Sequence, residues 1–157
     1  MFSFLGRQLF AMNVFHQIAA GILLLTLTLC LQVVGITALI EWLKRILAHD
    51  RHKQGPAHSA KLVVESLLAI LVLHVLTILL WATCYRWSCF PSWDLAFYFS
   101  ASSYSTVGYG DVVLPADWRL LGPAESIIGV LMCGISVSIL FALVSRLVDR
   151  DHAIRGE

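Results

Sequence analysis

The chain has 157 residues, of which 59% are hydrophobic and only 13% are charged, with a formal net charge of +1. Soluble domains usually carry about 25% charged residues, so this composition excludes an ordinary soluble domain and indicates a membrane protein. The near-neutral charge and the absence of a basic domain also argue against a nucleic-acid partner.

Apolar stretches at 14–40, 62–81 and 127–148 are each long enough to cross a bilayer, which takes about 20 helical residues. A fourth apolar patch, 95–104, is too short to span and is expected to form a re-entrant helix. The sequence therefore predicts an all-α membrane protein whose subunit has three transmembrane helices and one re-entrant helix.

Residues 1–48 are expected to hold an N-terminal segment and the first transmembrane helix. The apolar stretch is far longer than the 7–15 residues of a signal-peptide core, which argues against a cleaved signal peptide. Thr28, Gln32 and Gly35 fall on one helical face, which predicts packing against another helix. The span has no Asp, Glu, Lys or Arg, so we do not expect strong intrinsic voltage gating.

Residues 49–61 are predicted to form a cytoplasmic linker, because basic residues gather in and beside them. The basic residues are Lys44, Arg45, Arg51, Lys53 and Lys61. The positive-inside rule places such a cluster in the cytoplasm, which puts the N-terminus outside and the C-terminus in the cytoplasm. The linker histidines leave a metal or proton sensor open, although a solvated loop is the simpler interpretation.

The second transmembrane helix is predicted over 62–84, with His74 in its apolar middle. We interpret His74 as a neutral packing residue bonded to a neighbouring helix, with a threonine of the first span as one candidate partner. Cys84 and Cys89 follow on the predicted outer side. That compartment permits a disulfide within or between subunits, and free thiols are the alternative.

The re-entrant helix is predicted over 92–104. Ser92 can cap its N-terminus, and Asp94 in the first turn complements the helix dipole. The C-terminal end would point towards the membrane centre, where its partial negative charge favours a cation.

A five-residue motif follows this helix at 106–110. Its sequence, Thr-Val-Gly-Tyr-Gly, is that of potassium-channel filter loops, whose backbone carbonyls replace the hydration shell of K⁺. With its flanks, the stretch 62–148 resembles the pore module of the potassium-channel family, in particular the two-helix and two-pore-domain branch. Aiming successive carbonyls at one axis needs unusual backbone dihedrals, and the glycines can take a positive φ at little cost. The filter residues are Thr106, Val107, Gly108, Tyr109 and Gly110, and the resemblance implies K⁺ at the first four.

One filter loop supplies one carbonyl to each layer of oxygen ligands, whereas the ring needs four. The chain carries a single loop, so we expect a homotetramer with cyclic symmetry and a tetrameric pore within the lipid bilayer.

The resemblance also implies residues that support the filter. In relatives the residue at Asp111 bonds to a pore-helix side chain, and here Tyr98 is the expected partner. Ser102 stands where the simplest bacterial channels have a glutamate, so we do not carry over that family's inactivation behaviour. Pore-helix aromatic residues are expected to surround Tyr109: Phe97, Tyr98 and Phe99.

The inner helix is predicted over 123–148, starting at the Gly122-Pro123 step, because proline is tolerated at a first helical position. By resemblance, Gly134 matches the family's hinge glycine. Ser138 would face the water-filled cavity, and Ala142 would line the inner constriction.

Two further features of the inner segment stay open. Glu125, in the first turn, would either concentrate cations at the outer mouth or bond behind the filter. Residues 149–157 are expected to form a short cytoplasmic tail, where a regulatory partner is one candidate for the gating stimulus.

These expectations combine into a potassium-selective channel of the inner membrane that conducts passively, without a cofactor and without enzymatic activity. A potassium-transporter subunit is disfavoured, because such chains resemble four pore loops with degenerate filters. A non-conducting sensor or assembly subunit built on a channel scaffold is the remaining alternative, and the intact filter argues against it.

Overall fold

The structure is a computed structural model that describes the backbone of residues 2–49 and 56–155 and the side chains of residues 15–48 and 57–150. Within these ranges the regular structure is helical and contains no strand, as the composition and the long apolar stretches predicted. Three helical stretches are long and apolar enough to cross a membrane: Phe15–Ala48, Ala57–Ser88 and Ala116–Arg150.

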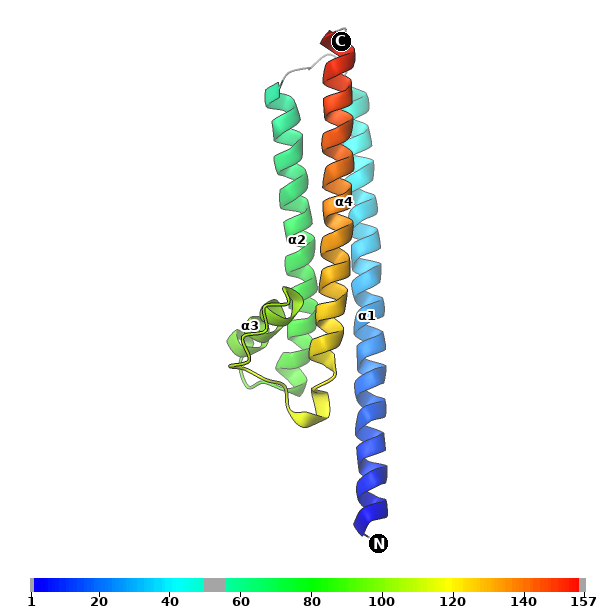
Figure 1. Ribbon diagram of the computed structural model, residues 1–157, viewed down its shortest axis with the longest axis vertical. Helices are drawn as coiled ribbons and strands as arrows, with labels where there is room; N and C mark the ends of the chain where they lie inside the picture. Colours follow the sequence, from blue (N-terminus) through cyan, green and yellow to red (C-terminus); the bar gives the residue numbers. More distant parts are fainter. Residues whose placement is uncertain (1, 50–55, 156–157) are drawn as a thin grey trace. The chain divides into compact units, whose positions relative to one another are not determined.

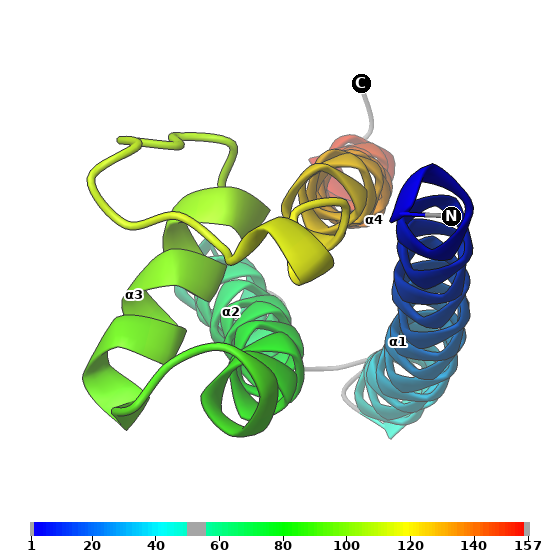
Figure 2. The same ribbon diagram turned by 90° about the horizontal axis from the view of Figure 1, so that it is seen from below.

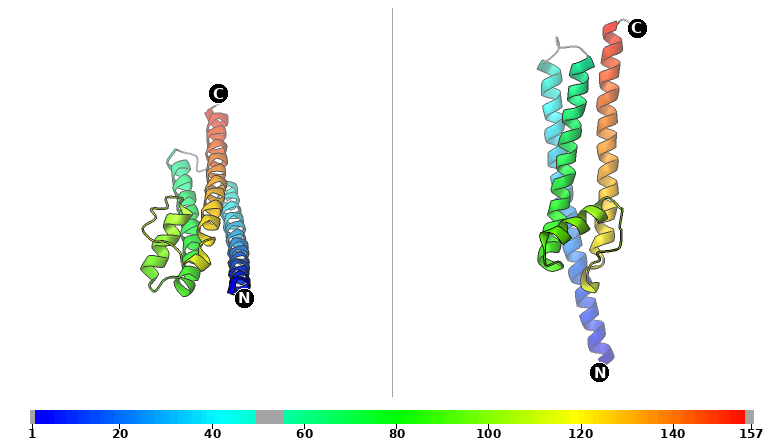
Figure 3. Two further views of the ribbon diagram at one scale, coloured as in Figure 1. Left: turned by 60° about the horizontal axis from the view of Figure 1, so that its bottom comes forward. Right: turned by 90° about the vertical axis from the view of Figure 1, so that its left-hand side faces the viewer.

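The elements follow one another as α1 (Phe2–His49), α2 (Pro56–Ser88), α3 (Trp93–Tyr104), the short 3₁₀ helix η1 (Ala116–Trp118) and α4 (Leu121–Arg155) (Figure 1). The loop that holds the 106–110 motif connects α3 to η1 and α4 (Figure 3).

The long helices extend further than the sequence predicted. α2 begins at Pro56, inside the predicted 49–61 linker, because proline suits a first helical position and no breaker follows it. It continues past residue 84 to Ser88. α4 begins at Leu121, two residues before the predicted start, because Pro123 falls in the first turn, where backbone N–H groups lack helical partners.

The predicted 149–157 tail is likewise helical as far as Arg155, because glycine and proline are absent between residues 149 and 155. Part of the predicted linker, including Arg51 and Lys53, lies outside the described residues.

The fold divides into two compact units, each built from segments of α1, α2 and α4. The first comprises residues 1–30 and 76–131 and contains α3 and the 106–110 loop. The second comprises residues 31–75 and 132–157. They are described separately below.

In the first unit, α1 is joined to its neighbours by hydrogen bonds of its buried polar residues. The Trp81 indole N–H of α2 donates to Thr28 Oγ1 at 3.0 Å, and both side chains are fully buried. The backbone N–H of Leu120 donates to Gln17 Oε1 at 3.2 Å. Each bond satisfies a polar group that would be costly to bury alone.

In the second unit, buried leucines and Ile70 form an apolar core between the three helices: Leu39, Leu43, Leu62, Ile70, Leu143 and Leu147. Gln32 is buried and Gly35 lies against Leu73, so the polar and small face predicted for the first span does pack against protein. His74 Nε2 lies 3.0 Å from Ser136 Oγ. The partner in this contact therefore lies on α4.

Candidate functional site

The start of α3 forms as its sequence predicted. Ser92 is the N-cap, and its hydroxyl oxygen accepts a hydrogen bond from the Leu95 backbone N–H at 3.3 Å. Asp94 lies in the first turn, where the positive end of the helix dipole favours a carboxylate.

Contacts with α2 and α4 fix the position of α3 within the first unit (Figure 2). The Ser100 hydroxyl donates to the Ile78 carbonyl of α2 at 2.9 Å. The Ser126 hydroxyl of α4 donates to the Ser103 carbonyl at 2.7 Å. Gly129 of α4 lies so close to Tyr104 that an added Cβ would overlap the Tyr104 carbonyl. Because Gly129 has no side chain, α4 can approach the end of α3 closely at this position.

α3 ends in a Schellman motif that also begins the 106–110 loop. The Thr106 N–H donates to the Ser103 carbonyl at 3.0 Å, and the Val107 N–H donates to the Ser102 carbonyl at 3.0 Å. The motif requires a left-handed residue after the C-cap, and this position usually holds glycine. Here it is Thr106, with φ +62°. A β-branched residue in this conformation is strained, so Thr106 keeps its hydroxyl at a cost in stability.

The backbone alternates along the loop. φ is +62° at Thr106, +54° at Gly108 and +78° at Gly110, whereas Val107 and Tyr109 have negative φ. When residues with positive and negative φ alternate, we expect successive backbone carbonyls to turn towards one side of the loop. The predicted positive φ of both glycines is confirmed, and the left-handed threonine extends the same alternation by one residue.

The apolar side chains of the loop are uncovered. Val107 is 52% exposed and Tyr109 is 71% exposed. An added Cβ at Gly108 or Gly110 would meet no atom within 4 Å. The chain alone therefore covers only a small part of the loop's surface.

Tyr98 and Asp111 meet behind the loop, as the resemblance implied. The Tyr98 hydroxyl donates to Asp111 Oδ2 at 2.8 Å, and the second oxygen, Oδ1, accepts the Val112 N–H at 3.0 Å. The bond to Asp111 raises the pKa of Tyr98 above its ordinary value of 10. The phenol therefore stays protonated and able to donate throughout the neutral range. The Tyr98 ring also stacks on Tyr109, with centroids 6.4 Å apart.

The expected aromatic surround of Tyr109 is only partly correct. Phe99 points elsewhere: its ring packs edge-on against Tyr85 at 5.1 Å and against Phe90 at 5.6 Å. The reason is the helical turn of about 100° between adjacent residues, which directs Tyr98 and Phe99 to different faces of α3.

Ser102 contributes through its backbone. Its carbonyl accepts the N–H groups of Val107 at 3.0 Å and Gly108 at 3.2 Å. Ser102 also lines a cavity of about 360 Å³ behind the loop, together with Tyr98 and Asp111.

Glu125, for which the sequence allowed two roles, forms buried hydrogen bonds. It is fully buried, and its two oxygens accept the hydroxyls of Tyr85 at 2.8 Å and Ser100 at 2.5 Å. Of the two interpretations, bonding behind the loop is correct, and a cation-concentrating role at the mouth is wrong. The carboxylate joins α4 to α2 and α3.

The residues assigned to gating lie on α4 in the second unit. An added Cβ at Gly134 would meet no atom within 4 Å. The Ser138 hydroxyl donates a hydrogen bond to the Gly134 carbonyl at 2.9 Å. Glycine–serine pairs of this kind are recognised kink sites, although α4 is continuous here. Ala142 borders a groove between α1 and α4, beside Leu43 and Arg146. It lies only about 40° around the helix from Ser138, so the two residues share a face of α4, and its place at an inner constriction stays a prediction.

Cys84, in the last turns of α2, and Cys89, directly after its end, are free thiols in the structure. Burial, with a smaller contribution from Cys84, raises the pKa of Cys89 from 9.0 to about 11. Because the raised pKa favours the neutral thiol in the fold, the associated stability is present below pH 9 and is lost as the pH rises through about 11.

We predict slow alkylation of Cys89, because the thiolate is the reactive species. A variant that keeps only Cys89 (Cys30→Ala, Cys84→Ala, Cys133→Ala) loses the smaller Cys84 contribution but keeps the effect of burial, so the maleimide rate should still increase between pH 8 and 10 without levelling off. The same variant unfolded in detergent is the control, with an ordinary thiol pKa near 8.5. A rate that levels off near pH 9 in the folded protein would contradict the prediction.

A second prediction concerns the strained threonine. Thr106→Gly should leave the thermal midpoint unchanged or raise it, because glycine adopts the left-handed conformation without the Cβ penalty of about 1–2 kcal/mol. Thr106→Ser, which keeps the hydroxyl, is the matched control. A lower midpoint for Thr106→Gly would show that the threonine side chain stabilises the loop.

Comparison with known proteins points to the same region. A family model described as an ion channel matches residues 73–146, which include part of α2, all of α3, the 106–110 loop and most of α4. No curated protein and no solved structure matches the chain. The match supports an ion-channel pore module over this stretch and, with the three long apolar helices, a multi-pass membrane protein.

Proposed function

We propose that this chain is the subunit of a potassium-selective channel, in which four copies place their 106–110 loops around one axis and K⁺ crosses passively. The observation that carries the proposal is the alternation of φ at Thr106, Gly108 and Gly110. It aligns backbone carbonyls, and rings of such carbonyls replace the hydration shell of K⁺ in potassium channels.

Two further observations support assembly. Val107 and Tyr109 expose apolar side chains beside the loop, which neighbouring subunits would cover. The chain also carries a single loop, so a closed ring needs four identical copies related by cyclic symmetry.

The supporting residues have defined parts in this proposal. Tyr98 and Asp111 hold the outer end of the loop through their 2.8 Å hydrogen bond, and the Ser102 carbonyl holds its inner end. Gly134 and Ser138 provide a bending point in the inner helix. The basic linker lies in the cytoplasm, which places the N-terminus outside in a bacterial inner membrane.

Passive efflux from liposomes tests the proposal. Purified protein is reconstituted into KCl-loaded liposomes, and released K⁺ is measured with an ion-selective electrode, with total release set by valinomycin. Protein-dependent efflux, absent from empty liposomes, is expected. Confirmed tetramers without efflux over a range of pH and membrane tension would favour the non-conducting scaffold instead.

A further inference from the structure

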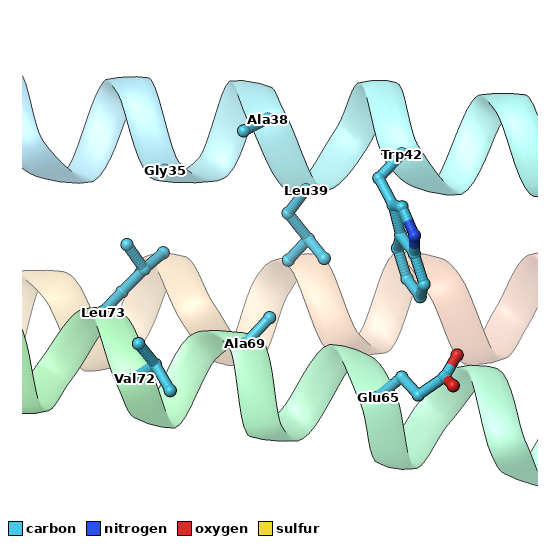
Figure 4. Close-up of a pocket in the computed structure, with 8 residues that line it drawn as sticks. All are labelled: Gly35, Ala38, Leu39, Trp42, Glu65, Ala69, Val72 and Leu73. Carbon is cyan, nitrogen blue, oxygen red and sulfur yellow. The ribbon is translucent and has the colours of Figure 1, made fainter.

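A pocket in the second unit lies between α1 and α2 and plays no part in the proposed conduction. It has a volume of about 380 Å³ (Figure 4). Small residues line it on both helices, at Ala38 of α1 and at Ala69 of α2, while Leu73 of α2 packs against Gly35. The remaining lining residues are apolar, with one exception at one end of the pocket.

That exception is Glu65, which lies within the apolar span of α2. Figure 4 shows its carboxylate and the Trp42 ring extending from opposite helices towards the same end of the pocket. Ionisable residues inside spans are rare and commonly mark ligand pathways or sites. A carboxylate beside an indole is the arrangement that binds an organic cation, by charge and by cation–π attraction.

Glu65 retains capacity for a ligand. Lys61 Nζ lies 3.7 Å from its carboxylate, whereas the Lys44–Glu41 pair is 2.8 Å apart. The Lys61 contact is thus long and partly solvated. A carboxylate also offers about four lone-pair sites, so a second donor can bind without displacing the lysine.

The order of groups along α2 selects the ligand. Glu65, Ala69 and Leu73 follow one another on one helical face, so the apolar lining extends about 12 Å beyond the carboxylate towards the middle of the span. An anionic lipid would place its negative head group beside the Glu65 carboxylate, and the two like charges would repel each other. A zwitterionic phospholipid would do the same, because its phosphate lies nearer to the acyl chains than its ammonium. A cation attached directly to a hydrocarbon chain matches this arrangement, in which the carboxylate is followed by an apolar lining.

We propose that this pocket binds a lipophilic amine from the bilayer, with the ammonium group between Trp42 and Glu65 and the hydrocarbon chain along Ala69 and Leu73. Such a ligand would lie between the peripheral helix α1 and the outer helix α2. The proposal does not depend on conduction, because binding is measured directly.

The test is native mass spectrometry of the whole protein titrated with dodecylamine, with dodecanol as an uncharged probe of the same chain length. We expect wild type to bind the amine about tenfold or more tightly than the alcohol. Glu65→Gln should lose that preference, and Ala69→Phe, which fills the pocket, should weaken binding of both probes.

Glu41→Gln is the matched control, because it removes a carboxylate from the same membrane region that does not line the pocket. Helical content and subunit number, measured for each variant, confirm folding. Equal affinity of wild type for the two probes, or an unchanged preference in folded Glu65→Gln, would overturn the proposal.

Discussion

Replacing Gly108 with alanine should reduce potassium flux more than about 100-fold while the protein still folds and assembles. Gly108 has φ +54°, where an L-residue with a Cβ costs about 1–2 kcal/mol. Four copies in one ring would raise this to about 4–8 kcal/mol, which favours a different loop conformation and misaligns the carbonyls. An added Cβ meets no atom within 4 Å, so the fold itself need not change.

Flux from proteoliposomes containing equal amounts of assembled protein measures this effect. Gly21→Ala is the matched control, because a Cβ at this helical position makes an ordinary 3.4 Å contact with Leu121. It should conduct like the wild type. Wild-type flux in Gly108→Ala would show that the left-handed conformation at this residue is not needed for conduction.

Replacing Glu125 with alanine should produce the largest loss of stability. The change leaves the buried hydroxyls of Tyr85 and Ser100 without the acceptors that now lie at 2.8 Å and 2.5 Å. An unsatisfied buried group costs about 1–3 kcal/mol. Ser100 keeps the Ile78 carbonyl as an acceptor, so the Tyr85 hydroxyl is the group left unsatisfied, and the free energy of unfolding should fall by about 1–3 kcal/mol.

Thermal unfolding in detergent, followed by tryptophan fluorescence and by loss of the assembled species, measures this prediction. Glu125→Gln keeps one acceptor oxygen and similar volume, so its loss should be smaller. Glu41→Ala removes an exposed carboxylate, whose ion pair with Lys44 is screened by solvent, and should leave the unfolding temperature close to that of the wild type. If Glu125→Ala unfolds at the same temperature as Glu41→Ala, the buried bonds contribute nothing measurable.

Local features of the site could be predicted from the sequence. The Ser92 cap, the positive φ of Gly108 and Gly110, and the helical character of the apolar stretches depend on neighbouring residues and on general backbone physics. The Tyr98–Asp111 contact was also expected, because the resemblance to a known motif supplied its partner.

Contacts between distant residues were harder to predict. Tyr85 and Glu125 are 40 positions apart, and nothing in the composition around either residue indicates that they meet. The direction of Phe99 depends on helix register, where one residue turns a side chain by about 100°. The left-handed conformation of Thr106 could have been predicted from the sequence, because a residue with positive φ is common directly after the C-cap of a helix.

The reversal potential of single channels or reconstituted membranes tests the central claim most directly. With a tenfold K⁺ gradient balanced by Na⁺, a potassium-selective pore should reverse close to the K⁺ equilibrium potential, about 59 mV from zero. A reversal potential near zero would mean that Na⁺ and K⁺ pass equally well, and it would contradict a filter built from the carbonyls of residues 106–110.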